Sequence, residues 1–162
     1  MKDEQLNTIF AAQYALPYAV SAYNKVIKDL VSFSFNHSAK TPPMTLCLKV
    51  IRLRERRDLL LHVYQALRAA IETLSDSDKG IMHSVFFYEK DGGYECRVSP
   101  KRASERFEKT GSYIRAVRAR SIRKMKPIIE EAVTEEEFLE LFGSVVCLKR
   151  VYDKFIKEEK KK

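Results

Sequence analysis

The chain has 162 residues, 45% of them hydrophobic, and a formal net charge of +8 at pH 7. A chain of this length and hydrophobic content can bury a sizeable core, which excludes global disorder. Five glycines and five prolines are too few for a turn-rich all-β fold, and the helix-forming residues Leu, Ala, Glu, Lys and Arg dominate. We therefore expect an all-α protein.

Hydrophobic residues at helical spacing predict three helices in the first half of the chain, over 3–16, 17–35 and 45–74. Pro17 ends the first helix or opens the second, and the polar, proline-containing segment 36–43 separates the second from the third. The run from Leu6 to Asn24 is uncharged and long enough to raise a membrane span. It contains polar residues and a proline, so we expect a buried or dimerising helix pair and no membrane contact.

Capping signals predict five further helices, over 76–88, 100–108, 112–125, 135–142 and 144–157, the last followed by a basic tail. Ser75 is an N-cap for the first of these, Ser99-Pro100 opens the second, and Thr134 with Glu137 forms a capping box. Residues 84–98 are ambiguous, because hydrophobic stretches flank Asp91-Gly92-Gly93 and a β-hairpin is the alternative. We expect a helix to about Tyr88, then a loop or a short hairpin.

The chemistry-bearing residues do not predict catalysis. Three cysteines and three histidines are scattered without metal-ligand spacing, so we expect the cysteines to be small buried apolar groups or free thiols in a reducing cytoplasm, and no metal site. No glycine-rich phosphate loop and no nucleophile motif with its base is present. We therefore expect a protein that is not an enzyme and needs no cofactor.

The positive charge is concentrated between Arg97 and Lys126, where eleven basic residues accompany two acidic ones. This surplus exceeds the net charge of the whole chain, as expected of a surface that docks on a phosphate backbone. The same stretch predicts a helix-turn-helix over 103–125, with Phe107 buried in its first helix and Thr110-Gly111 in the turn. The residues expected on the buried side of its second helix are Ile114, Val117, Ser121, Ile122 and Met125.

The outward residues of this unit are the candidate DNA contacts. A helix with small and polar residues in its first turns can enter the major groove and present donors to base edges. We expect Tyr113 and Arg115, next to Ser112, to contact bases. The expected phosphate contacts are Lys101, Arg102, Arg106, Arg120, Arg123 and Lys124.

Residues 74–126 resemble the promoter-reading C-terminal domain of bacterial sigma factors and of sigma-like regulators of phages and mobile elements, including the ArpU type. Glu105-Arg106-Phe107 aligns with that family's Glu-Arg-Leu, Thr110 with its Ser, and Ile114 with its Val. Ser121-Ile122 and Arg123-Lys124-Met125 align with its Ala-Leu and Lys-Lys-Leu finish. The chain departs from the family at Glu108 (usually Gly), Lys109 (usually apolar) and Arg118 (commonly a buried Leu), and by about seven extra residues around KDGGYEC.

The resemblance implies a cytoplasmic regulator of transcription that binds double-stranded DNA, with RNA polymerase as a further partner. We expect a helical dimerisation or partner module at 1–73, the helix-turn-helix at 74–126 and a helical extension at 127–162. The acidic residues 130–137 form a solvated face or a docking surface for a basic partner. The alternative function is a small helical interaction protein that binds a nucleoprotein complex through its basic helix without reading sequence.

Overall fold

The computed structural model describes residues 1–36 and 42–159, with side chains described for 1–32 and 42–155. The predicted break at 36–43 and the basic tail therefore lie largely outside the described residues. The protein is all-α, as expected, with a single small hairpin in the described part. The helices are α1 (Asp3–Ala11), α2 (Ala15–Asn36), α3 (Pro43–Glu72), α4 (Asp76–Phe86), α5 (Pro100–Phe107), α6 (Gly111–Ala132), α7 (Glu135–Ser144) and α8 (Val146–Glu159).

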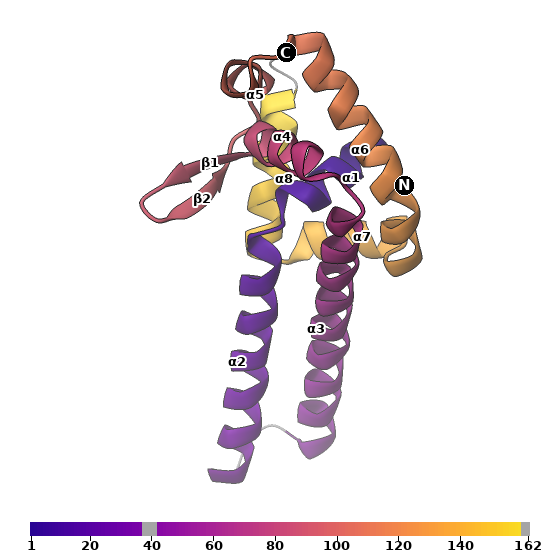
Figure 1. Ribbon diagram of the computed structural model, residues 1–162. Helices are drawn as coiled ribbons and strands as arrows, with labels where there is room; N and C mark the ends of the chain where they lie inside the picture. Colours follow the sequence, from indigo (N-terminus) through magenta and orange to yellow (C-terminus); the bar gives the residue numbers. More distant parts are fainter. Residues whose placement is uncertain (37–41, 160–162) are drawn as a thin grey trace.

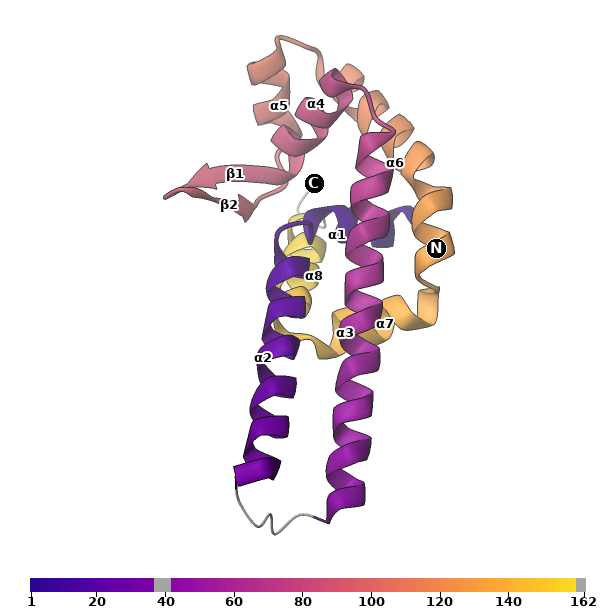
Figure 2. The same ribbon diagram turned by 60° about the horizontal axis from the view of Figure 1, so that its bottom comes forward.

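The helices form a head and a projecting arm. α2 and α3 lie side by side and antiparallel, and their outer halves extend well beyond the other elements (Figures 1 and 2). We call residues 24–36 of α2 and 43–58 of α3 the arm. On α3 the fully buried positions begin at Leu60 and continue with Val63, Leu67 and Ala70. α3 therefore enters the core only in its second half, and its first half depends on α2 and on its own helix-forming residues.

α1 lies at the centre of the head. Its seven residues from Gln5 to Ala11 are all buried, and it packs against α6 and α8. The predicted helix 3–16 ends earlier, because a turn at 12–14 separates α1 from α2. Pro17 falls in the first turn of α2, where a missing amide hydrogen leaves no helical hydrogen bond unmade.

The hairpin replaces the last turn of the helix that we expected to reach Tyr88. α4 ends at Phe86, and β1 (Phe87–Lys90) pairs antiparallel with β2 (Gly93–Cys96). Asp91 and Gly92 occupy the turn with φ values of 47° and 79°. Positive φ at both central residues gives the two-residue turn that matches strand twist, and Asp-Gly tolerates it best. Turn chemistry therefore outweighs the helical pattern here.

α6 is longer than predicted. We expected a helix over 112–125, but it continues through Pro127 to Ala132. Pro127 cannot donate to a carbonyl one turn earlier, which destabilises a helix interior. Ile129 and Ala132 beyond it are buried, at 1% and 7% exposure, and their burial offsets that cost. The boundary expected at residue 126 thus lies within one continuous helix, which packs along α3.

The uncharged N-terminal run from Leu6 to Asn24 is long enough that a membrane span had to be considered. None of the helices of the described residues has the length and apolarity that a membrane span requires.

Candidate nucleic-acid interface

The corner between α5 and α6 is built from three residues. Glu108 ends α5 in the left-handed region, with φ 51° and ψ 40°, which turns the chain sharply. Lys109 N–H then donates to the Ser104 carbonyl at 3.1 Å, and the Ser104 hydroxyl donates back to the Lys109 carbonyl. Thr110 caps α6 by accepting from Tyr113 N–H at 3.2 Å. Two separate helices therefore meet at a defined corner, at the top of Figure 1.

The inner side of α6 is the one that helical spacing predicts. Its buried residues include all five expected ones: Ile114, Val117, Ser121, Ile122 and Met125. Phe107, expected to be buried in α5, is only partly buried and lies against Gly80 of α4, where an added Cβ would sit 3.3 Å from its ring. α4, α5 and α6 consequently pack into one three-helix unit that leaves the outer side of α6 uncovered.

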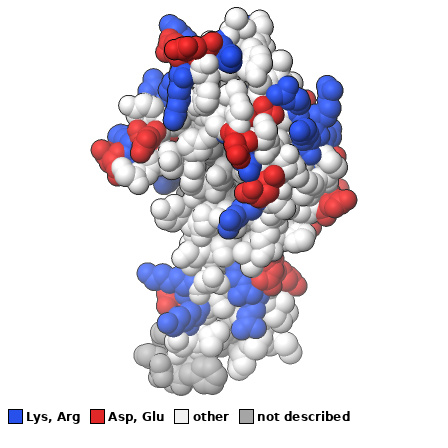
Figure 3. Space-filling model, in the orientation of Figure 1, with Lys and Arg blue, Asp and Glu red and all other residues white. Residues whose placement is uncertain are grey.

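A narrow ridge of small side chains runs along that outer side. Ser112, Ala116, Ala119 and Arg123 follow one another at spacings of four, three and four residues, and all four are exposed. Such spacing places them on one line of the helix. Three of the four side chains are small, so the backbone of α6 can approach a surface closely for about two turns. Figure 3 shows Lys and Arg side chains gathered over this part of the molecule.

Basic side chains flank the ridge, and several of them are free. Arg115, Arg123 and Lys124 are exposed and make no hydrogen bond or ion pair among the described residues. Lys101 is 89% exposed and lies 4.0 Å from Glu105, a distance that indicates a weak pair. Arg106 is exposed beside the ring of Phe107. These cations remain available to an anionic partner.

Arg120 and Tyr113 lie on the same flank of the ridge as Lys124, across the ridge from Arg115. Arg120 Nη2 is 2.8 Å from Oδ1 of Asp78, a carboxylate that is only 6% exposed, while the arginine itself is 53% exposed. Its pKa is raised, first by this hydrogen bond. Tyr113 is 41% exposed. The ion pair connects α6 to α4 and orients the guanidinium without covering it.

Arg102 is placed differently from the other predicted phosphate contacts. Its guanidinium donates to the carbonyls of Ser84 at 2.7 Å, Phe87 at 2.6 Å and Arg97 at 3.3 Å. It also lies 5.6 Å from the centre of the Tyr88 ring. Arg102 thus satisfies carbonyls at the end of α4 and holds the root of the hairpin, so its donors are directed into the protein. A phosphate contact by Arg102 stays a prediction that this geometry does not favour.

Arg118 is a second inward arginine of the basic segment. Its Nε donates to Asn7 Oδ1 at 3.0 Å, and its guanidinium lies 5.2 Å from the centre of the Phe86 ring. This is the position where the sigma family commonly has a buried Leu. The charge of Arg118 suggests an exposed residue. Its position directly after Val117, on the buried side of α6, is the feature of the sequence that indicates an inward side chain.

The hairpin carries the opposite charge from α6. Glu89, Asp91 and Glu95 accompany one cation, Lys90, in its strands and turn, and acidic atoms gather at its end in Figure 3. Lys154 of α8 pairs with Glu95. A hairpin of this charge would be repelled by a phosphate backbone, so the candidate interface is confined to α5 and α6.

An aromatic cluster that the sequence did not reveal anchors this hairpin to the head. Tyr14 stacks on Tyr94 with ring centres 4.8 Å apart, and its hydroxyl lies 2.9 Å from Nε2 of His83. His83 also meets Tyr94 edge-on at 4.6 Å. Burial, followed by the charges of Arg106 and Arg102, lowers the pKa of His83 below its usual 6.5, while Glu89 opposes the shift.

No family model, no curated protein and no solved structure matches the chain.

Proposed function

We propose that the protein is a sequence-specific, double-stranded-DNA-binding regulator of transcription that inserts α6 into the major groove. The observation that carries this proposal is the exposed ridge of Ser112, Ala116 and Ala119, flanked by free basic side chains. A major groove about 12 Å wide admits an α-helix, and small residues on its leading side allow close approach to the base edges.

The first turns of α6 supply different contacts from its later turns and α5. Arg115 lies within the first two turns of α6, where its guanidinium can offer paired donors to a guanine. Arg123 and Lys124 lie about two turns later, and Lys101 and Arg106 project from α5. These four cations would bind phosphates on either side of the groove and set the position of α6 on the duplex. Tyr113 is proposed as a base contact beside them.

The resemblance to sigma-like regulators supports the transcriptional part of the proposal, with RNA polymerase as the protein partner and the cytoplasm as the location. Reading by a homodimer fits the same proposal, because dimeric helix-turn-helix proteins bind paired half-sites.

The experiment is selection from a random duplex library with the full-length protein, followed by fluorescence anisotropy with the selected and a scrambled duplex. Arg115→Ala should remove most of the preference for the selected duplex, by about 1–3 kcal/mol of discrimination. Arg123→Ala should weaken both duplexes to the same extent. Arg150→Ala, an exposed position on α8, is the matched control. No enriched sequence, with equal affinity for every duplex, would contradict the proposal.

A second function has one observation in its favour. Arg102 and Arg118, two of the eleven basic residues of the segment, are directed into the protein, and Arg120 is paired with Asp78. The remaining ridge of small residues also suits close packing against a protein helix. The alternative is therefore an interaction protein that binds a nucleoprotein complex without reading sequence, and the selection experiment distinguishes the two.

A further inference from the structure

The outer side of α3 in the arm carries exposed hydrophobic residues. Met44, Leu48 and Ile51 are 74%, 50% and 49% exposed. Their spacing of four and three residues puts them along one side of the helix. Leu46 and Val50, which are partly covered, point roughly the opposite way. The arm therefore presents a second hydrophobic side in addition to the one directed toward α2.

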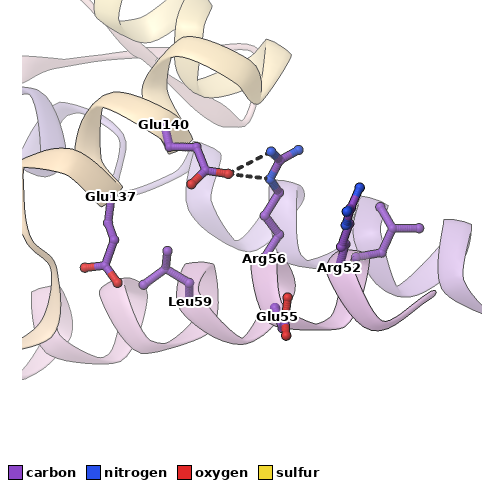
Figure 4. Close-up of a pocket in the computed structure, with 7 residues that line it drawn as sticks. Arg52, Glu55, Arg56, Leu59, Glu137 and Glu140 are labelled. Atoms are coloured by element: carbon purple, nitrogen blue, oxygen red, sulfur yellow. Dashed lines mark hydrogen bonds and ion pairs between the residues drawn. The ribbon is translucent and has the colours of Figure 1, made fainter. Parts of the chain in front are cut away.

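Beside this hydrophobic side runs a groove between α3 and α7. One part has a volume of about 660 Å³ and is lined by Arg52, Leu53, Glu55, Arg56, Leu59, Glu137 and Glu140. An adjoining part of about 360 Å³ is lined by Thr45, Leu48, Lys49, Arg52 and Leu53. The two parts share Arg52 and Leu53, so we treat them as one docking groove, and Figure 4 shows the residues that line the larger part.

The two ends of the docking groove have opposite charge. The outer turns of α3, residues 43–54, contain Lys49, Arg52 and Arg54 and no acidic residue. These three cations make no ion pair among the described residues. α7, at the inner end, contains four glutamates and no basic residue.

Among the described residues, one intramolecular ion pair connects the two helices that border the groove. Arg56 Nη2 of α3 lies 2.7 Å from Glu140 Oε1 of α7, and this bond, followed by a hydrogen bond with Tyr23, raises the pKa of Arg56. The pair shows that α7 accepts a guanidinium from α3. Glu136, one turn before Glu140 on α7, is exposed and has no ion-pair partner among the described residues.

We infer that a second copy of this chain occupies the docking groove, with the arm of each copy lying across α7 of the other. A two-fold axis near Glu55, perpendicular to α3, sets the two α3 helices antiparallel and places residues 49–54 of each copy level with residues 56–61 of its partner, where α3 borders α7. It brings the basic turns of each copy to the acidic α7 of its partner, so the complementary contact forms twice.

The chain itself supplies both halves of this contact, which is the reason for assigning the groove to a second copy. Burial of Met44 and Leu48 gives the hydrophobic contribution, and the charge pattern gives orientation. A parallel arrangement would instead place the basic turns of both copies together and α7 against α7. The inference uses no residue of the α5–α6 corner and is independent of DNA binding.

The test is the molar mass of the full-length protein without DNA, measured by sedimentation equilibrium from 5 to 100 μM. The wild type should have twice the mass of one chain at the upper concentrations. Lys49→Glu with Arg52→Glu, the arm variant, should be monomeric, and so should Glu136→Lys with Glu140→Lys, the α7 variant. An equimolar mixture of the two variants should regain the dimer, because both contacts then pair opposite charges again.

Lys149→Glu with Arg150→Glu on α8 makes the same charge change at exposed positions away from the groove and should leave the dimer intact. Circular dichroism of each variant checks that it folds. A monomeric wild type at 100 μM overturns the inference. So does a dimer that persists in the arm variant, or a mixture of the two variants that stays monomeric.

Discussion

Glu108 adopts a backbone conformation that is unfavourable for a residue with a side chain. With φ at 51°, the residue is left-handed, a region that costs a residue with a Cβ roughly 1–2 kcal/mol and costs glycine little. The turn between α5 and α6 needs this conformation because three residues alone must reverse the chain and cap both helices. The sigma-like family usually has glycine at this position, and the geometry gives a physical reason for that preference.

We expect Glu108→Gly to raise the free energy of unfolding by about 0.5–1 kcal/mol, because the strain is relieved at the cost of some chain entropy. Urea denaturation followed by circular dichroism measures the change. Glu105→Gly, within α5, should instead lower stability by about 1 kcal/mol. Equal losses in both variants would contradict this account of the corner.

Ser121 is a polar residue on the buried side of α6. It is fully buried, and its hydroxyl has no hydrogen-bond partner among the described residues. A buried polar group without a partner costs about 1–3 kcal/mol. Its spacing predicted its burial but did not predict that its hydroxyl would be left without a bond.

Replacing Ser121 by Ala should therefore raise the free energy of unfolding by about 1 kcal/mol, since the penalty is removed and Ala has the higher helix propensity. The exposed Ser112→Ala substitution on the same helix reports the propensity contribution alone. Thermal or urea denaturation compares the two. A Ser121→Ala gain no larger than that of Ser112→Ala would indicate that the hydroxyl is not penalised.

At the scale of elements, the hairpin depends on a titratable anchor. His83 packs between Tyr14, Phe87 and Tyr94, and burial there lowers its pKa in the folded protein. In the unfolded chain the imidazole titrates near its usual pKa of about 6.5. The anchor therefore contributes its full stability above this pH, and the contribution is lost as the pH falls toward the folded-state pKa.

We predict that stability decreases between pH 7.5 and 5.5 and that His83→Gln reduces this decrease. The range stays above the pKa of the carboxylates, so that their titration contributes little. Urea denaturation at several pH values measures the slope. His62→Gln, at an exposed histidine of α3, is the matched control for replacing a histidine. An unchanged slope in His83→Gln would show that the anchor does not titrate in this range.

The elements also show how far local signals reach. Ser75, Ser99, Thr110 and Thr134 cap their helices, and helix starts after such residues could be predicted within one or two positions. The end of α6 could not, because α6 packs along α3, which is distant in sequence. The hairpin could not be predicted with the same accuracy. The turn residues Asp91-Gly92 indicate a hairpin, the preceding pattern indicates a helix, and residue spacing alone favours neither.

For the whole molecule, the basic segment divides into outward and inward charges, and the two groups should respond differently to substitution. Under the proposed function, Lys124→Ala removes one phosphate contact and reduces the slope of log affinity against log salt by about 0.9, with little effect on stability. Arg118→Gln should leave that slope unchanged and lower stability, since its guanidinium bonds Asn7 and covers Phe86. Anisotropy titrations at four salt concentrations and urea denaturation measure both. Equal slopes for Lys124→Ala and the wild type would exclude Lys124 as a contact.

The sequence by itself determined the all-α class, the corner between two helices, and which side of α6 is buried. These depend on neighbours three or four residues apart, whose spacing is visible in the chain. Only the tertiary structure decided where Arg102 and Arg118 point and that α6 passes Pro127. It also decided that the basic outer turns of α3 and the acidic α7 border one groove. Each of these depends on which distant surfaces meet, because the environment of a charge or a helix end is set by partners that local periodicity does not specify.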